Sequence, residues 1–136
     1  MNTVIGLIAG SLRKESFSKK IAKALLPMAP QGFEFKIISI DSLPIYNQDF
    51  DDYNEVPESY VKFRDEIRKL AGVIFITPEH NRSVPAALKN AIDIGSRPAG
   101  KSVWDGNGDL KDEDVKGFLQ KAVGAYAEWF KKNSII

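Results

Sequence analysis

An unbroken apolar run, Val4 to Ala9, lies near the start of the chain and ends in Gly10 and Ser11. Because no polar residue alternates within it, the run predicts a strand that is buried on both faces, as strands of a parallel sheet usually are. Parallel neighbours need long crossover connections, which helices normally supply. The run therefore predicts the first strand of an α/β domain.

Helical and strand patterns alternate after this first strand. Apolar residues recur at helical spacing from Phe17 to Leu25, after a capping serine (Ser16 or Ser18) and before Pro27, which stops the helix. The stretch Phe33 to Ile40 begins with alternating apolar and charged residues, which indicates a strand near one edge of the sheet.

The same order then repeats. Apolar residues at every third or fourth position predict a helix that has Pro57 in its first turn and stops at Gly72. The apolar run Val73 to Thr77 predicts a third, central strand, and a helix follows from about Pro85 to Ile94. Strands and helices in this alternation indicate a doubly wound parallel sheet, which binds ligands at the carboxyl ends of its strands.

Length and composition narrow the class of protein. The 136 residues, 43% of them hydrophobic, fit one globular domain covering residues 1–136, with Asp41 to Pro57 and Gly95 to Asp112 as long loops. A net charge of +1 argues against nucleic acid or an anionic membrane as a partner. The first apolar run is too short for a signal peptide or a membrane span, so we expect a cytoplasmic protein. The chain has no cysteine, so redox chemistry would need a bound cofactor.

The loop Gly10 to Ser18 joins the first strand to a helix N-terminus and carries three serines and Arg13. Helix N-terminal N–H groups, hydroxyls and a guanidinium together suit a phosphate, provided that Glu15 faces away. The sequence matches neither G-x-G-x-x-G nor a P-loop, which argues against a dinucleotide site of the Rossmann type and against an NTPase. On residue types alone, serines that merely cap a helix and a solvated arginine remain an equal alternative.

A second polar loop, Thr77 to Pro85, follows the third strand. Its donors, acceptors and backbone amides suit the edge of a planar heterocycle. Two loops at the ends of neighbouring strands would form one crevice, which favours a ligand site over simple helix capping.

These loops carry a family resemblance. The segments G-S-L-R-x-x-S-F-S at 10–18 and T-P-E-H-N-R-S-V-P-A-A-L-K-N-A-I-D at 77–93 resemble the NADPH-dependent FMN reductase family, which includes quinone, azo-dye and chromate reductases. The resemblance extends from residue 3 to about residue 104 and implies a flavodoxin-like fold.

The resemblance also implies the site residues. Ser11, Arg13, Ser16 and Ser18, with Phe17 in the same motif, would hold the FMN phosphate, while Pro78, Glu79, His80, Asn81 and Ser83 would border the isoalloxazine ring. His80 stands where the family more often has tyrosine, and we do not assign it a proton-donor role. Because NADPH or NADH would deliver hydride to the flavin, no catalytic side chain and no metal are implied.

The sequence departs from the family after Trp104. The family continues with a strand, a glycine-rich loop, a helix and a fifth strand, whereas this chain passes directly to Asp105 to Leu110, a shortening of roughly 40 or more residues. The predicted fold is thus a shortened flavodoxin-like doubly wound parallel sheet with three or four recognisable strands. Its last helix, from about Asp112 to Phe130, and an exposed strand edge favour a homodimer or higher homo-oligomer.

One apparent metal motif is weak. Asp105, Asn107 and Asp109 have the first spacings of a calcium loop, but Leu110 and Lys116 stand where glycine and glutamate are needed, so a plain turn is the better interpretation.

Three functions therefore stay open. The first is an FMN-dependent NAD(P)H oxidoreductase that acts on a small-molecule electron acceptor, such as a quinone, an azo dye or a metal oxyanion. The alternative is a shortened, non-enzymatic flavodoxin-like scaffold with weak or no FMN binding. A module for another phosphate compound is a third, weaker interpretation.

Overall fold

The computed structural model describes residues 1–98 and 100–104. The chain divides into two compact units, Met1–Gly106 and Asn107–Ile136, and all that follows concerns the first. The predicted last helix and the calcium-like turn lie outside the described residues. Within the described ranges, no helix has the length and hydropathy that crossing a bilayer requires.

Three parallel strands form the sheet, in the order β2-β1-β3. They are β1 (Thr3–Ala9), β2 (Phe33–Ile37) and β3 (Gly72–Ile76). Thr3 of β1 lies opposite Phe33, and Ile5 lies opposite Gly72. β1 lies between the other two, and five of its seven residues are therefore buried, as its unbroken apolar sequence predicts.

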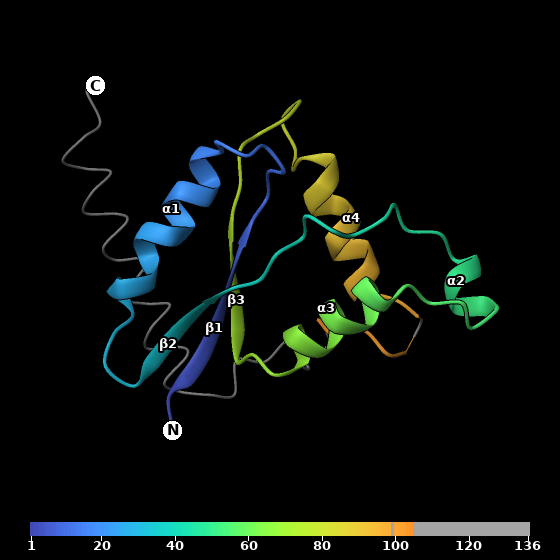
Figure 1. Cartoon of the computed structure of the whole chain (residues 1–136), viewed down its shortest axis with the longest axis horizontal. Coiled ribbons are helices and arrows are strands. Elements are labelled where there is room, and N and C mark those ends of the chain that lie inside the picture. Colours follow the sequence, from blue (N-terminus) through green and yellow to red (C-terminus); the bar gives the residue numbers. More distant parts are fainter. Residues whose placement is uncertain (99, 105–136) are drawn as a thin grey trace. The chain divides into compact units, whose positions relative to one another are not determined.

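Helices cover both faces of this sheet (Figure 1). On one side lies α1 (Phe17–Leu25), which the short 3₁₀ helix η1 (Leu26–Met28) extends. On the other side lie α3 (Glu58–Arg68) and α4 (Ala86–Gly95). Successive side chains of β1 point to opposite faces of the sheet, and Ile8 points to the face that α3 and α4 cover. It belongs there to a buried cluster that consists of Ile8, Ile38, Ile40, Tyr60, Phe63, Ile67, Leu88, Ala91 and Ile94. The predicted doubly wound architecture is confirmed.

Several predicted boundaries were wrong. Helix α3 ends at Arg68 with Lys69 as its C-cap, and Gly72, the predicted stop, is already the first residue of β3. The chain can enter the sheet this early because the Ala71 N–H donates to the carbonyl of Val4 at 2.9 Å. Pro57, predicted to lie in a first turn, is the N-cap of α3. Helix α4 begins at Ala86 with Pro85 as its N-cap, within one residue of the predicted start.

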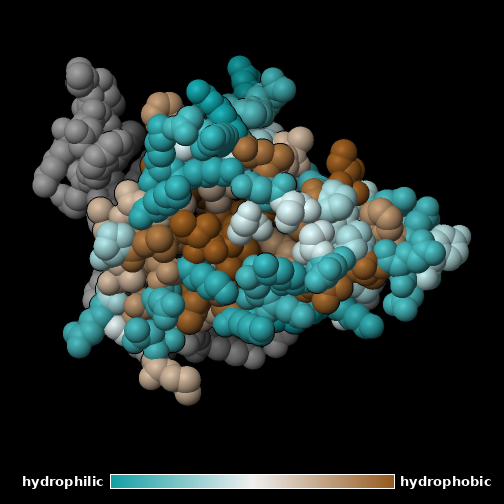
Figure 2. Space-filling model, viewed as in Figure 1, coloured by the Kyte–Doolittle hydropathy of each residue, from teal (hydrophilic) through white to brown (hydrophobic). Residues whose placement is uncertain are grey.

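The strands also differ in detail from the predictions. β2 ends at Ile37, although the pattern continued to Ile40, because the segment leaves the ladder and turns Ile38 and Ile40 into the core. β3 was predicted to be central, but in the described part of the chain it pairs with β1 alone and is an edge strand. β2 is the other edge of the sheet, as predicted. Figure 2 shows hydrophobic residues gathered over the middle of the face of the molecule that is in view, with hydrophilic residues around them.

A short helix that the sequence did not predict, α2 (Asp49–Asp52), lies within the predicted loop Asp41 to Pro57. Four residues are too few to show helical periodicity, so this helix had no sequence signal. It carries Asp51, whose role in fixing the loop is described below.

Candidate active site

The two predicted loops begin side by side at the carboxyl ends of β1 and β3 (Figure 1). Ala9 pairs with Ile76, and the Gly10 N–H donates to the carbonyl of Ile76 at 2.8 Å. A Cβ atom on Gly10 would lie only 2.8 Å from the Cβ of Thr77, so the strand tips approach this closely because residue 10 is glycine. The predicted juxtaposition of the two loops is confirmed.

The first loop is shaped by its own side chains. Ser16 is the N-cap of α1, only 4% exposed, and its Oγ accepts from the Lys19 N–H at 3.4 Å. The Oγ of Ser11 accepts from the Arg13 N–H at 3.4 Å. The first N–H groups of any helix have no intrahelical acceptor, and here the capping hydroxyl binds that of Lys19. The N–H groups of Phe17 and Ser18 are left without an acceptor within the helix. This donor set fits a phosphate group.

Charge in the first loop is consistent with an anion site. Arg13 is exposed and forms no ion pair within the described residues. The carboxylate of Glu15 lies 3.2 Å from the ammonium of Lys20, and both side chains are exposed. Lys20 thus neutralises the negative charge that would otherwise oppose a phosphate in this loop. Ser18 is buried, whereas the ring of Phe17 is largely exposed and lies beneath the Lys20 ammonium.

The second loop contains a tight two-residue turn. His80 and Ser83 exchange two backbone hydrogen bonds, both of 3.0 Å, around Asn81 and Arg82, which have φ angles of 51° and 60°. Left-handed backbone is uncommon for arginine, and such conformations concentrate at functional sites. Pro78 is half-buried, whereas Glu79, His80, Asn81 and Ser83 are exposed at the tip of the loop. Eight of the ten predicted site residues thus lie on two adjoining loops, and Phe17 and Ser18 begin α1 directly after the first of them.

A cavity of about 210 Å³ lies between the first loop, the segment after β2 and the start of α4. Its lining is mostly apolar and comes from Leu12, Ile40, Leu43, Ile45, Ala86, Ala87 and Asn90. The sequence analysis did not identify these residues as functional. A usable signal was present, because the segment after β2 must begin at the same edge of a parallel sheet as the segments after β1 and β3.

Asn90 fixes one wall of this cavity. Its Oδ1 accepts from the Tyr46 N–H at 2.8 Å, and its Nδ2 donates to the carbonyl of Pro44 at 2.9 Å. The Tyr60 hydroxyl donates to the same Pro44 carbonyl at 3.0 Å. Ile45, between these anchors, is 85% exposed. The wall therefore presents an apolar side chain from a backbone that three side-chain hydrogen bonds hold in place.

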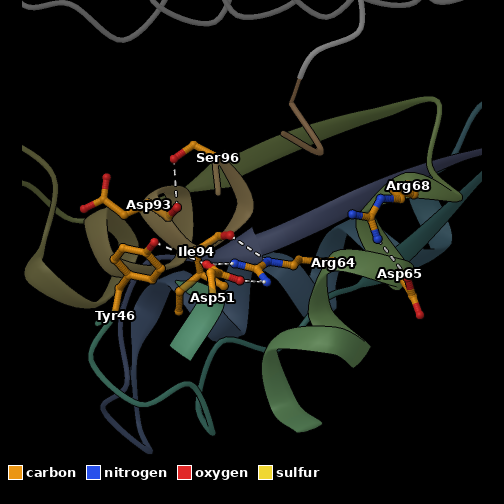
Figure 3. Close-up of polar contacts among 8 residues, drawn as sticks. All are labelled: Tyr46, Asp51, Arg64, Asp65, Arg68, Asp93, Ile94 and Ser96. Atoms are coloured by element: carbon orange, nitrogen blue, oxygen red, sulfur yellow. Dashed lines mark hydrogen bonds and ion pairs between the residues drawn. The ribbon is translucent and has the colours of Figure 1, made fainter. Parts of the chain in front are cut away.

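A buried ion pair anchors the rest of the same loop (Figure 3). The guanidinium of Arg64 donates to both carboxylate oxygens of Asp51, at 2.9 and 3.0 Å, while its Nε donates to the carbonyl of Ile94 at 2.9 Å. The Tyr46 hydroxyl donates to Asp51 at 3.2 Å. Hydrogen bonding by Arg64 holds the pKa of Asp51 below its usual value, although burial opposes this shift. Burial and the neighbouring Asp51 raise the pKa of Tyr46.

A second cavity, of about 320 Å³, lies between α1 and the segment that follows β2. Lys14, Lys19 and Lys23 contribute to its lining together with Asp41. Lys19 is already engaged, because its ammonium lies 2.9 Å from Asp41 and donates to the carbonyl of Leu12 at 3.4 Å. Lys19 therefore connects the first loop, through Leu12, to the segment that follows β2, through Asp41.

Comparison with known proteins agrees with this geometry. A family described as NADPH-dependent FMN reductase matches residues 3–110. A quinone reductase of Pseudomonas putida is 52% identical over 102 residues, which are 75% of this chain and 54% of that protein. A 2-hydroxy-1,4-benzoquinone reductase of a Burkholderia species is 46% identical over 102 residues, 75% of this chain and 55% of that protein. The chain thus spans about half the length of these curated relatives.

A solved structure is also similar. The flavoenzyme FerB, an NAD(P)H:(acceptor) oxidoreductase from Paracoccus denitrificans, superposes with a TM-score of 0.70 at 28% identity and covers 98% of this chain and 100% of its own. The parallel sheet, with two loops at one edge, and the extent of these matches all point to the same family. The chain belongs to the NADPH-dependent FMN reductase family.

Proposed function

We propose that this chain binds FMN and, with NADPH or NADH, reduces a small-molecule acceptor such as a quinone, an azo compound or a metal oxyanion. The observation that carries the proposal is the meeting of two unlike loops at neighbouring strand tips, one with the donors of an anion site and one with a polar turn. The names of its relatives, quinone reductases among them, favour this function over a non-enzymatic scaffold.

In this proposal the first loop holds the FMN phosphate. Ser11, Ser16 and Ser18 supply hydroxyls, Arg13 supplies a guanidinium, and the first turn of α1, beginning at Phe17, supplies N–H groups and a positive dipole end. Ser16 can cap the helix and still donate its hydroxyl proton, because the capping bond uses only an oxygen lone pair.

The second loop would border the flavin ring. Pro78, Glu79, His80, Asn81 and Ser83 lie on a turn that two backbone hydrogen bonds fix, so its polar groups are already positioned before a ligand binds. Bound FMN would supply the redox chemistry, since it accepts hydride from NAD(P)H and returns two electrons to the acceptor. No side chain is then required as a nucleophile, in keeping with a chain that has no cysteine.

We also propose that the protein is cytoplasmic and forms a homodimer or higher homo-oligomer. The absence of cysteine suits a reducing compartment. The outer edge of β3, which pairs with no strand in the described part of the chain, would be protected by association with a second copy.

Titration of the purified chain with FMN tests the proposal. The expected result is saturable binding, with a flavin absorbance band at about 450 nm that NADPH bleaches and a quinone restores. Replacement of Arg13 by alanine should weaken FMN binding by about 10- to 150-fold, the equivalent of a lost charged hydrogen bond. Arg68→Ala, which removes an exposed arginine paired with Asp65, is the matched control and should leave FMN binding unchanged. A chain that ignores FMN would favour the scaffold.

A further inference from the structure

We propose that the cavity of about 210 Å³ between the first loop, the segment after β2 and the start of α4 binds the apolar substituent of an uncharged acceptor, with Ile45 as the residue that determines specificity. This inference rests on the proposed function and names the class of acceptor: quinones that carry a short alkyl group.

The chemistry of the lining selects an apolar group. Six of the seven lining residues have hydrocarbon side chains, and Asn90 is the seventh. Its Oδ1 already accepts from the Tyr46 N–H, and its Nδ2 already donates to the Pro44 carbonyl. A charged substituent would lose water there and find no opposite charge in the lining, which is costly, whereas an alkyl group would be stabilised by burial.

The cavity is held open by its surroundings. Ile45 is 85% exposed, and a freely moving loop would tend to bury it against Leu12 and Leu43. Asn90 and Tyr60 prevent this collapse because they bind the backbone on either side of Ile45. The exposed isoleucine is therefore presented by a rigid support, which is the arrangement that ligand recognition requires.

The size and position of the cavity identify which part of a ligand it takes. Pockets for whole small molecules occupy roughly 300–1,000 Å³, so a volume of about 210 Å³ suits a substituent and not a complete ring system. Leu12 lies within the first loop, and Ala86 directly follows the second. Ile40, Leu43 and Ile45 follow β2, so the cavity extends beyond the two loops assigned to FMN and is available to a second ligand.

The kinetic test compares 1,4-benzoquinone with its 2-methyl, 2-ethyl and 2-propyl derivatives. In the FMN-loaded protein, kcat/KM should rise about two- to fourfold for each carbon added, as expected when each buried methylene gains its transfer free energy. Replacement of Ile45 by serine should flatten this trend, so that kcat/KM no longer rises with the length of the alkyl group. Val61→Ser, at another exposed apolar residue on α3, is the control and should preserve the trend.

A binding test that needs neither flavin nor turnover separates this inference from the proposed function. Redox-inert propylbenzene should shift the NMR methyl signals of Leu12, Ile45 and Ala87. In the Ile45→Ser variant the signals of Leu12 and Ala87 should no longer shift. If FMN does not bind but propylbenzene still shifts these signals, the proposed function fails and the apolar cavity stands. A trend with alkyl length that survives Ile45→Ser would overturn the inference.

Discussion

Gly10 determines how closely the two candidate loops approach each other. Its N–H is bonded to Ile76, and any side chain there would meet Thr77 and Leu88. The sequence analysis used Gly10 as the end of a strand, but a strand end does not reveal which residue of another strand lies beside it. That information comes from the register of β1 with β3.

Replacement of Gly10 by alanine should destabilise the fold by about 1–3 kcal/mol, because overpacking at a strand tip forces the backbone or Thr77 to move. Its new Cβ would lie 2.8 Å from the Cβ of Thr77 and 3.1 Å from Leu88 Cδ2. Urea unfolding measures the change. Gly72→Ala is the control, since its nearest neighbour would be Ile5 at an ordinary 3.4 Å. Equal stability of the two variants would show that the strand tips are not in contact.

The Asp51–Arg64 pair predicts a specific dependence of stability on pH. Arg64 holds the pKa of Asp51 below 3.8 in the folded chain. A lowered folded-state pKa contributes stability that is present above the ordinary value and is lost as pH falls through the folded-state pKa. Stability should therefore decrease below about pH 4, and unfolding curves from pH 7 to pH 2 should show it.

Asp51→Asn removes the titrating group and should give a shallower decrease over the same pH range. At neutral pH this variant should be less stable by about 3–5 kcal/mol, because the Arg64 guanidinium, only 6% exposed, keeps its charge without a carboxylate. Asp65→Asn alters an exposed pair and serves as the control. An acid dependence as steep in Asp51→Asn as in the parent chain would refute the assignment.

At the scale of elements, the strands and helices followed from their apolar patterns, whereas their ends did not. Helix α1 has strong signals, a capping Ser16 and Pro27 just beyond its last residue, and its bounds were predicted closely. Helix α3 lacks such a stop, and its end is set by the hydrogen bond from Ala71 to Val4 in the neighbouring strand. A contact of that kind is not encoded in local sequence.

The loop from Pro44 to Asp51 shows the same limit more strongly. Its sequence predicted a loop that either lines a site or simply connects elements, with no indication of what holds it; Asn90 on α4 and Arg64 on α3 fix it from opposite ends. Both partners lie far along the chain, so no local pattern could reveal them. Asn90 lies within the segment that carried the family resemblance, but nothing in that segment indicated which backbone atoms it would bind.

Replacement of Asn90 by alanine should release the wall of the smaller cavity. The Tyr46 N–H loses its acceptor, while the Pro44 carbonyl keeps the Tyr60 hydroxyl, so the expected loss of stability is about 1–3 kcal/mol. Hydrogen exchange at the Tyr46 amide should accelerate more than the global loss explains. Lys89→Ala, which breaks only an exposed pair with Asp93, is the matched control. Unchanged protection of the Tyr46 amide would contradict the role given to Asn90.

At the scale of the whole molecule, the sequence was sufficient for the architecture and for the two loops, because buried strands and loop motifs are local features. It placed β3 at the centre, since an apolar run shows that a strand is buried but not how many neighbours it has; in the described residues β3 is an edge strand. The apolar cavity was missed because it is built from three segments, after β1, after β2 and at the start of α4.

The account depends on one ligand contacting both loops at once. Amide NMR of the chain during an FMN titration tests this directly, because each loop reports separately. We expect signals from 11–18 and from 79–83 to shift together with one dissociation constant, while those of Gln31 and Gly32, in the turn that precedes β2 at the opposite end of the sheet, stay unchanged. Shifts confined to one loop, or absent from both, would contradict the account.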